Sequence, residues 1–329
     1  MTSSTDAEPP ASSPEGRVPD FFIVGHAKSG TTALYEMLRR HPEIYMPEQK
    51  EPWYFASDMK PRFEPFIAGV GPQSLAEYLA LFGGAGPGQR AGEASSSYLW
   101  SMTAAEAISE VAPDARIIAI LREPADFLRS LHLQLLQSHV EDQQDLRRAI
   151  GLEAERRAGR HIPRRSHRPQ LLQYAGHVRY AEQLKRYSAH FPPEQMLVLI
   201  YDDFRRDNEA AIRQVLGFLD VQQDWPVEVL DVNRTVRMRS QRLDKIVHTA
   251  SAGRGPLARG ARAAVKAVTP RSLRREALSV AREKVVHGAP RPVDQDFALE
   301  LRRRFRPEVV ALSEYLDRDL VKLWGYDQL

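Results

Sequence analysis

The sequence predicts an α/β fold in which helices flank a parallel β-sheet. Three short apolar runs, at 20–25, 116–121 and 196–201, have the length and composition of buried strands. Stretches that read as helical separate or follow these runs, at 31–41, 102–112, 124–158 and 175–190. Continuous apolar strands that alternate with helices indicate a parallel sheet covered on both faces. In such sheets, ligands bind outside the carboxyl ends of the strands.

The first apolar run ends in a loop with the composition of a phosphate-binding site. Gly25 and Gly30 allow tight turns, so that backbone N–H groups and the positive end of a helix starting near Thr31 face a phosphate. Lys28 adds a full positive charge within the loop. We expect four loop residues to hold the phosphate, and these are Ser29, Gly30, Thr31 and Thr32. His26 also lies in the loop. If the loop serves a group transfer, His26 is a candidate for contact with the group that is transferred or with the molecule that accepts it.

The position of the lysine separates this loop from the Walker loop of kinases and ATPases. The Walker loop places its lysine directly after the second glycine, whereas Lys28 stands two residues before Gly30. This arrangement suits one 5′-phosphate whose bridging oxygen becomes a leaving group. At this point the chain resembles the sulfotransferases that use 3′-phosphoadenosine 5′-phosphosulfate (PAPS) as sulfonyl donor. The resemblance implies the P-loop NTPase-like sulfotransferase fold, with Lys28 on the leaving oxygen and no metal.

A second motif matches the part of the family that holds the 3′-phosphate of PAPS. The run at 116–121 delivers Arg122 at its carboxyl end, followed by Pro124 and, further along a predicted helix, by Ser130. An arginine offers a planar fork of donors to a phosphate, and a serine adds a hydroxyl. The resemblance implies that Arg122 and Ser130 clamp the 3′-phosphate.

A third motif, Tyr201-Asp202-Asp203, follows the run at 196–201. In the family, the tyrosine of this motif lies near the adenine of the donor. Tyr201 could equally be a core aromatic residue with a satisfied hydroxyl.

Transfer to a hydroxyl also needs a general base. The cytosolic branch of the family uses the histidine of a Lys-Thr-His motif, which this sequence lacks. In the carbohydrate branch, which includes the heparan-type enzymes, a glutamate before an aromatic pair in this region is the base, and the resemblance assigns this role to Glu51. Trp53, Tyr54 and Phe55 follow it and predict an apolar wall around the carboxyl group. Glu93 lies in a segment resembling a family strand and is a candidate for orienting the acceptor or Lys28.

The resemblance implies transfer of a sulfonyl group from PAPS to a hydroxyl, with adenosine 3′,5′-bisphosphate as the second product. A carbohydrate, a glycolipid and a hydroxylated secondary metabolite are all open as acceptors, and an amine acceptor stays open too. Two other functions compete with this one. A P-loop kinase of a nucleoside or sugar would need magnesium ligands and a lysine after Gly30. A non-enzymatic protein that binds nucleic acid or an anionic membrane would use basic residues alone; we expect no nucleic-acid partner.

Composition and length set the outer limits. We expect a disordered tail at 1–17, rich in Ser, Pro and Ala, and a single domain at 18–329. The sequence has no cysteine and no apolar run long enough to span a membrane, which favours a cytoplasmic protein. The remaining histidines lack metal-ligand spacing. Arginine greatly outnumbers lysine, which indicates a bacterial source with a GC-rich genome.

A basic excursion at about 234–290 forms part of the predicted domain. Between 234 and 286 the chain has fourteen Lys and Arg residues against three Asp and Glu. A basic segment helps to close over the 3′-phosphate in the family, and Arg239 is a candidate for this role. Small apolar residues alternate with arginine from 253 onward, so 253–286 is a candidate for peripheral membrane contact or for an anionic acceptor. The oligomeric state is not encoded in any motif.

Overall fold

The computed structural model describes residues 16–59, 71–164, 166, 168–226, 237–238, 287–288 and 294–329. The chain divides into two compact units, the first formed by Met1–Glu123 and Arg179–Asn233 and the second by Pro124–Val178 and Arg234–Leu329. Most of the tail at 1–17 and of the basic excursion lies outside the described residues. Within the described ranges, no helix combines the length and apolar character that a membrane span requires.

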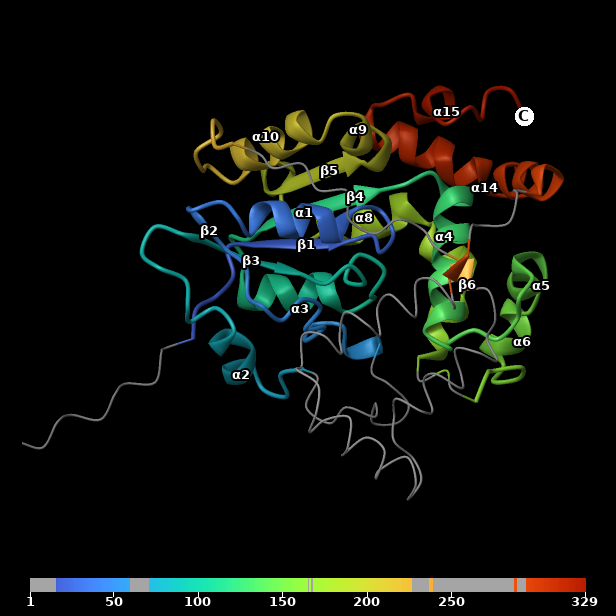
Figure 1. Cartoon of the computed structure of the whole chain (residues 1–329), viewed down its shortest axis with the longest axis horizontal. Helices are drawn as coiled ribbons and strands as arrows, with labels where there is room; N and C mark the ends of the chain where they lie inside the picture. The colour runs from blue at the N-terminus through green and yellow to red at the C-terminus, as the bar shows by residue number, and fades with distance from the viewer. Residues whose placement is uncertain are drawn as a thin grey trace, which may run out of the picture. The chain divides into compact units, whose positions relative to one another are not determined.

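The first unit contains the predicted parallel sheet, which has five strands (Figure 1). Their order across the sheet is β2 (Ile44–Tyr45), β3 (Arg90–Ala94), β1 (Phe21–Gly25), β4 (Arg116–Leu121) and β5 (Met196–Ile200). Every neighbouring pair is parallel. The three apolar runs of the sequence are β1, β4 and β5, which lie side by side. Because all strands run the same way, the residues that follow them gather at one edge of the sheet.

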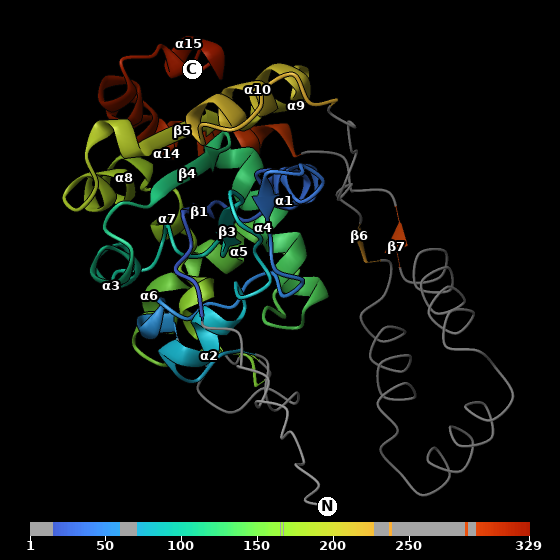
Figure 2. The same cartoon turned by 90° about the vertical axis from the view of Figure 1, so that its left-hand side faces the viewer.

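Helices cover both faces of this sheet, as Figure 2 shows with α1 (Thr31–Leu38) on one side and α3 (Ala104–Val111) and α8 (Tyr180–Ser188) on the other. The helices α1 and α10 (Asn208–Phe218) share a buried apolar cluster with β1, β4 and β5. Short elements connect these parts, namely η1 (Ser57–Met59), α2 (Leu75–Ala80), η3 (Pro193–Gln195) and α9 (Tyr201–Arg206). Burying this cluster fixes α1 against the sheet, and with it the loop that precedes α1.

The second unit is mainly helical. Its elements are α4 (Pro124–Gln137), α5 (Leu146–Gly151), α6 (Glu153–Arg157), η2 (Pro169–Leu172), α7 (Tyr174–His177), β6 (Arg237–Met238), β7 (His287–Gly288), α14 (Gln295–Leu316) and α15 (Leu320–Leu323). The long helix α14 packs against α4 and α15 and buries Leu301, Phe305, Val309 and Leu312. These four residues recur at helical spacing and form one apolar face of α14.

The continuous helix predicted at 124–158 is wrong, because the chain leaves the helix after Gln137 and resumes it at Leu146. The break surrounds Glu141, whose buried carboxylate accepts hydrogen bonds from the Asp142 and Gln143 N–H groups, at 2.9 Å each. It also accepts from Nη1 and Nη2 of Arg156, at 2.7 Å each. Asp145 then caps α5. The stretch at 175–190 is likewise divided, into α7 and α8.

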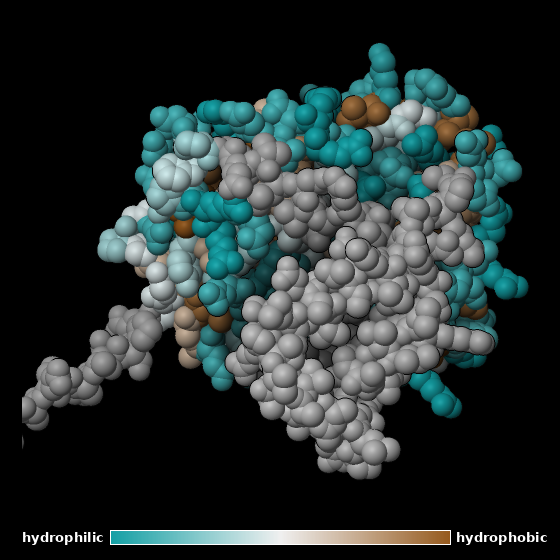
Figure 3. Space-filling view, viewed as in Figure 1, coloured by the Kyte–Doolittle hydropathy of each residue, from teal (hydrophilic) through white to brown (hydrophobic). Residues whose placement is uncertain are grey.

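On the face shown in Figure 3, hydrophilic side chains cover most of the described surface.

Candidate active site

The loop after β1 folds back on the sheet before α1 begins. The His26 N–H donates to Ile120 O on the neighbouring strand at 2.7 Å, and the Ser29 N–H donates to His26 O at 3.2 Å. Lys28 and Gly30 both have left-handed backbone conformations, with φ of 63° and 95°. No described side chain caps the start of α1. The first N–H groups of the helix and its positive end are thus available to an anion.

Three hydroxyl groups lie in this loop and at the start of α1. Ser29 and Thr31 are buried, and Thr32 is partly buried. The Ser29 hydroxyl has no hydrogen-bond partner among the described residues. A buried hydroxyl without a partner is rare in folded proteins, and a ligand that accepts its hydrogen bond is one explanation.

Arg122 connects the loop with the residue that follows β5. Its Nη1 donates to Lys28 O at 3.2 Å, and its guanidinium lies over the Tyr201 ring, 4.9 Å from the ring centroid. Tyr201 also lies beside Gly30, where an added Cβ would come within 3.4 Å of its ring. Burial, followed by the positive charge of Arg122, lowers the pKa of the Lys28 ammonium. Lys28, Arg122 and Tyr201 therefore lie together, although each belongs to a different sequence motif.

Three further residues are expected near the sulfonyl donor, namely His26, Ser130 and Arg239. The His26 ring is buried and packs against Tyr180, with 5.7 Å between ring centroids. Ser130 is buried on α4, in the second unit, and its hydroxyl has no partner in the described part of the chain. Arg239 lies outside the described residues. The roles suggested for these three residues stay predictions.

Glu51 lies in a loop that is fastened to the end of β3. The backbone N–H of Glu51 donates to Ala94 O at 3.1 Å, and the next anchoring bond runs from the Trp53 N–H to Ser95 Oγ at 3.2 Å. Two residues further on, the Phe55 N–H donates to the Tyr98 hydroxyl at 3.3 Å. This attachment holds Glu51 and Trp53 in left-handed conformations, with φ of 60° and 56°. Such conformations are costly for these residues and often occur at functional sites.

The carboxylate of Glu51 accepts four hydrogen bonds. Oε1 accepts from Lys50 Nζ at 2.6 Å and from Ser96 Oγ at 2.8 Å. Oε2 accepts from Trp53 Nε1 at 2.6 Å and from the Ser96 N–H at 3.0 Å. The apolar wall expected around this group is therefore wrong. Of the three aromatic residues, Trp53 gives the carboxylate a hydrogen bond, and Tyr54 and Phe55 pack against Tyr78 instead.

Glu93 lies near Glu51, on β3, and is fully buried. Its Oε2 accepts from the Tyr78 hydroxyl at 2.7 Å. Burial raises the pKa of Glu93 to about 7, and the charge of Glu51 adds to this effect, while hydrogen bonds from Ser95, Tyr78 and Tyr98 oppose it. The two glutamates thus occupy contrasting environments. Glu51 accepts hydrogen bonds from cationic and neutral donors, whereas Glu93 is enclosed among tyrosines.

The sequence did not reveal the part played by Ser96. The only signal was a run of three serines after a strand, at 95–97, which offers small side chains and backbone N–H groups.

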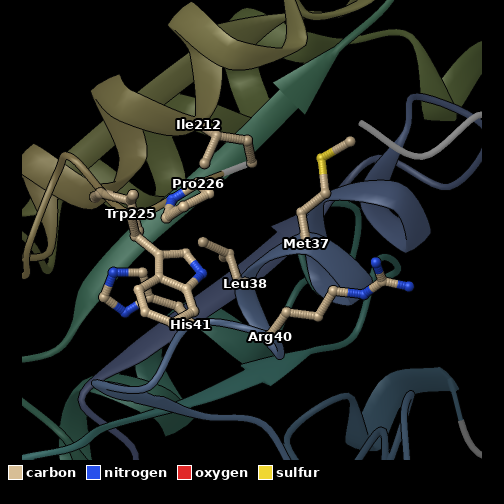
Figure 4. Close-up of a pocket in the computed structure, with 8 residues that line it drawn as sticks. Met37, Leu38, Arg40, His41, Ile212, Trp225 and Pro226 are labelled. Atoms are coloured by element: carbon tan, nitrogen blue, oxygen red, sulfur yellow. The ribbon is translucent and has the colours of Figure 1, made fainter. Parts of the chain in front are cut away.

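The helices α1 and α10 border a pocket of about 190 Å³, in which the Trp225 ring faces His41 (Figure 4). This pocket contains none of the residues predicted for the site. Across the described ranges, no group of three His, Asp or Glu side chains is arranged to hold a metal ion.

Comparison with known proteins shows the family of this chain. The family model of the sulfotransferase domain matches residues 18–253. The human bifunctional heparan sulfate N-deacetylase/N-sulfotransferase 3 is 29% identical over an alignment of 219 residues, which covers 62% of this chain and 22% of that protein. The heparan sulfate glucosamine 3-O-sulfotransferase 3B1 of Mus musculus is 27% identical over 207 residues, covering 63% of this chain and 47% of its own. This chain thus spans less than half the length of either relative.

A solved structure extends the likeness over nearly the whole chain. The crystal structure of a sulfotransferase from Alicyclobacillus acidocaldarius superposes with a TM-score of 0.64 and 26% identity, covering 92% of this chain and 98% of that one. Its sequence identity is low, but the match includes both chains almost completely. Since the family model covers well over half of the sequence, the protein belongs to the sulfotransferase domain family and is a transferase enzyme.

Proposed function

We propose that the protein transfers a sulfonyl group from PAPS to a hydroxyl of a carbohydrate, with a glycolipid, a secondary metabolite or an amine as further acceptor classes. The observation that carries the proposal is the meeting of Lys28, Arg122 and Tyr201 around Gly30, at the carboxyl edge of the sheet. Two cations, an uncapped helix start and an aromatic ring are the groups that a nucleotide with two separate phosphates requires.

The residues of the loop fit the 5′ end of such a donor. The backbone at Ser29 and Gly30 and the hydroxyls of Thr31 and Thr32 would hold the 5′-phosphate, and the unpartnered Ser29 hydroxyl supports this. Lys28 would stabilise the charge on the leaving oxygen. We assign the 3′-phosphate to Arg122 and Ser130 and the adenine to Tyr201. The donor supplies the activated sulfonyl group, and no metal is needed in this proposal.

Glu51 is the proposed general base. It would take the acceptor proton while the acceptor oxygen bonds to sulfur and the bond from sulfur to the phosphate oxygen breaks. The left-handed backbone at Glu51 and the hydrogen bonds to β3 support a fixed position for this carboxylate. The hydrogen bonds from Ser96 and Trp53 to the carboxylate support the same fixed position.

The relatives guide the choice of acceptor. Both curated relatives described above are named for reactions on heparan sulfate, and human carbohydrate sulfotransferase 15 is 29% identical over 160 residues. We therefore place carbohydrates first among the acceptors. We also propose a cytoplasmic location in a bacterium, which the absence of cysteine and the excess of arginine in the sequence suit. Peripheral membrane contact through 253–286 stays a proposal, because that segment lies outside the described residues.

Calorimetric titration tests the donor site directly. The ligands are adenosine 3′,5′-bisphosphate, 5′-AMP and ATP with magnesium, each added to the full-length protein and to its Lys28→Ala and Arg122→Ala variants. We expect the bisphosphate to bind more tightly than 5′-AMP, and we expect Arg122→Ala to remove most of this preference. Magnesium ATP binding as well as or better than the bisphosphate would contradict the proposal and favour a kinase.

A transfer assay with PAPS and a panel of heparan-type oligosaccharides then tests the reaction, with mass spectrometry of the products. We expect a mass increase of one sulfonyl group on the acceptor, lost in Lys28→Ala. Binding of the bisphosphate without transfer to any member of the panel would exclude heparan-type acceptors and direct the search to glycolipids and small hydroxylated metabolites.

A further inference from the structure

The carboxylate of Glu51 has no lone pair left for a substrate. A carboxylate offers about four acceptor sites on its two oxygens, and four donors occupy them. A base must accept a hydrogen bond from the group that it deprotonates. One of the four donors must therefore leave before Glu51 can act on an acceptor.

The four donors differ in how firmly they are held. The Ser96 N–H belongs to the backbone next to β3, and the Ser96 hydroxyl is buried. The indole of Trp53 belongs to a residue whose own backbone is bound to Ser95 Oγ. Lys50 differs from both, because its ammonium sits at the end of a flexible four-carbon stem whose three donors rotate freely. The side chains of Lys50 and Glu51 are 19% and 26% exposed, so their ion pair is within reach of an incoming molecule.

We propose that Lys50 is a positioning residue that occupies Oε1 of Glu51 in the resting enzyme and yields this place to the acceptor hydroxyl. Ser96 and Trp53 keep the carboxylate in position during the exchange. The inference rests on the proposed role of Glu51 as base. It adds that the acceptor must displace a specific ammonium group, and that an acceptor carrying its own anion near the hydroxyl is favoured, because this anion can receive the released Lys50.

Carboxyl labelling tests the inference without any substrate. The protein is treated with a water-soluble carbodiimide and glycine ethyl ester, and the rate of modification at Glu51 is measured by mass spectrometry of chymotryptic peptides. We expect Lys50→Met to raise this rate about tenfold or more, the size of one net hydrogen bond to a charged group. Lys50→Arg, which keeps a donor, and Lys185→Met, which removes an exposed lysine of α8, should label at the rate of the unaltered protein. Equal rates in Lys50→Met and the unaltered protein would overturn the proposal.

Steady-state kinetics with PAPS and an oligosaccharide acceptor give the second test. Lys50→Met should lower the KM for the acceptor about threefold, because no donor has to be displaced. Ser96→Ala should instead lower kcat, and Ser96→Thr, which keeps the hydroxyl, should restore it. A KM unchanged by Lys50→Met would contradict the displacement. If the unaltered protein transfers no sulfonyl group, the proposed function fails. The labelling rates still show whether Lys50 occupies Oε1 of Glu51 and limits access to the carboxylate.

Discussion

The guanidinium of Arg122 lies against the ring of Tyr201 and at the same time donates to the backbone of Lys28. One side chain thus joins residues that are 79 and 94 positions away in the sequence. The contact with the ring restricts the orientation of the guanidinium, and the hydrogen bond to Lys28 O restricts its position. A phosphate approaching Arg122 therefore meets a donor fork that is already oriented, which lowers the entropy cost of binding.

Replacing Tyr201 tests this orientation. Tyr201→Leu removes the ring, whereas Tyr201→Phe keeps it and removes the hydroxyl. We expect Tyr201→Leu to weaken binding of adenosine 3′,5′-bisphosphate about fivefold or more, in line with the loss of a cation–π contact and of stacking. Calorimetric titration of both variants gives the comparison, and we expect Tyr201→Phe to bind nearly as the unaltered protein does. Equal weakening in the two variants would show that the hydroxyl matters and the ring contact does not.

Gly30 is the second position at which a small change should be felt. Its φ of 95° disfavours any side chain, and a Cβ would come within 3.2 Å of the Phe204 ring. We expect Gly30→Ala to lower the free energy of unfolding by about 2 kcal/mol and to weaken bisphosphate binding, because the loop must shift.

Gly88 provides a matched control for this substitution. It has a similar left-handed conformation, with φ of 80°, but an added Cβ would meet nothing within 4 Å. Gly88→Ala should therefore lower the free energy of unfolding by about 1 kcal/mol, from backbone strain alone, and leave binding unchanged. Urea unfolding and calorimetry of both variants give the comparison. Similar losses in both would show that the contacts with Phe204 are easily relieved.

Glu51→Gln tests the proposed base. The substitution keeps the shape of the side chain and removes its ability to take a proton, so we expect kcat to fall about 10²- to 10⁴-fold. The dissociation constant of the bisphosphate should not change, because Glu51 is not among the proposed donor contacts. Glu48→Gln serves as the control, since the Glu48 side chain is nearby in sequence and 95% exposed. A kcat reduced equally by both substitutions would rule out a specific role for Glu51.

Glu93 makes the stability of the protein depend on pH. Its pKa rises from 4.5 to about 7 on folding. Between these values the folded state retains the proton and the unfolded chain has released it, so the free energy of unfolding falls as pH rises through this window. The contribution of protonated Glu93 is fully present below pH 4.5 and lost above about pH 7, and amounts to about 3 kcal/mol.

Glu93→Gln should remove this dependence, because glutamine resembles the protonated acid at every pH. We expect the variant to be more stable than the unaltered protein at pH 8 and about equal at pH 5. Urea unfolding at a series of pH values gives both curves, with Glu110→Gln as an exposed control on α3. Parallel curves for the Glu93 variant and the unaltered protein would contradict the raised pKa.

The strands β1, β4 and β5 were predictable, and β2 and β3, on the other side of β1, were less so. The runs that form β1, β4 and β5 are almost entirely apolar, as is typical of strands in a parallel sheet covered by helices. In contrast, β3 has the sequence Arg-Ala-Gly-Glu-Ala, without a β-branched residue. Its Gly92 lies against the Phe21 ring, where a Cβ would come within 2.0 Å of a ring carbon. The same close packing that completes the sheet thus removes the compositional signal of a strand.

The environment of Glu51 could not be read from its neighbours in sequence. Three aromatic residues follow it closely, and an apolar surrounding was the natural prediction. Tyr54 and Phe55 pack against Tyr78 instead of Glu51, and two of the four hydrogen bonds to the carboxylate come from Ser96, which is 45 positions away. The motifs of the donor loop were easier to interpret, because backbone geometry at glycine and the position of one lysine carry most of their meaning.

The order of strands in the sheet also links catalysis to folding. Lys28 follows β1, Arg122 follows β4 and Tyr201 begins α9 directly after β5, so no contiguous stretch shorter than about half of the chain contains the three residues. The contacts between them depend on pairing that closes long loops, which is slow to establish. A nucleotide that needs all three can be held only after β5 has joined the sheet. Binding of the nucleotide would thus show that the sheet of the first unit has formed completely. The bound fraction would measure how much of the protein has finished folding.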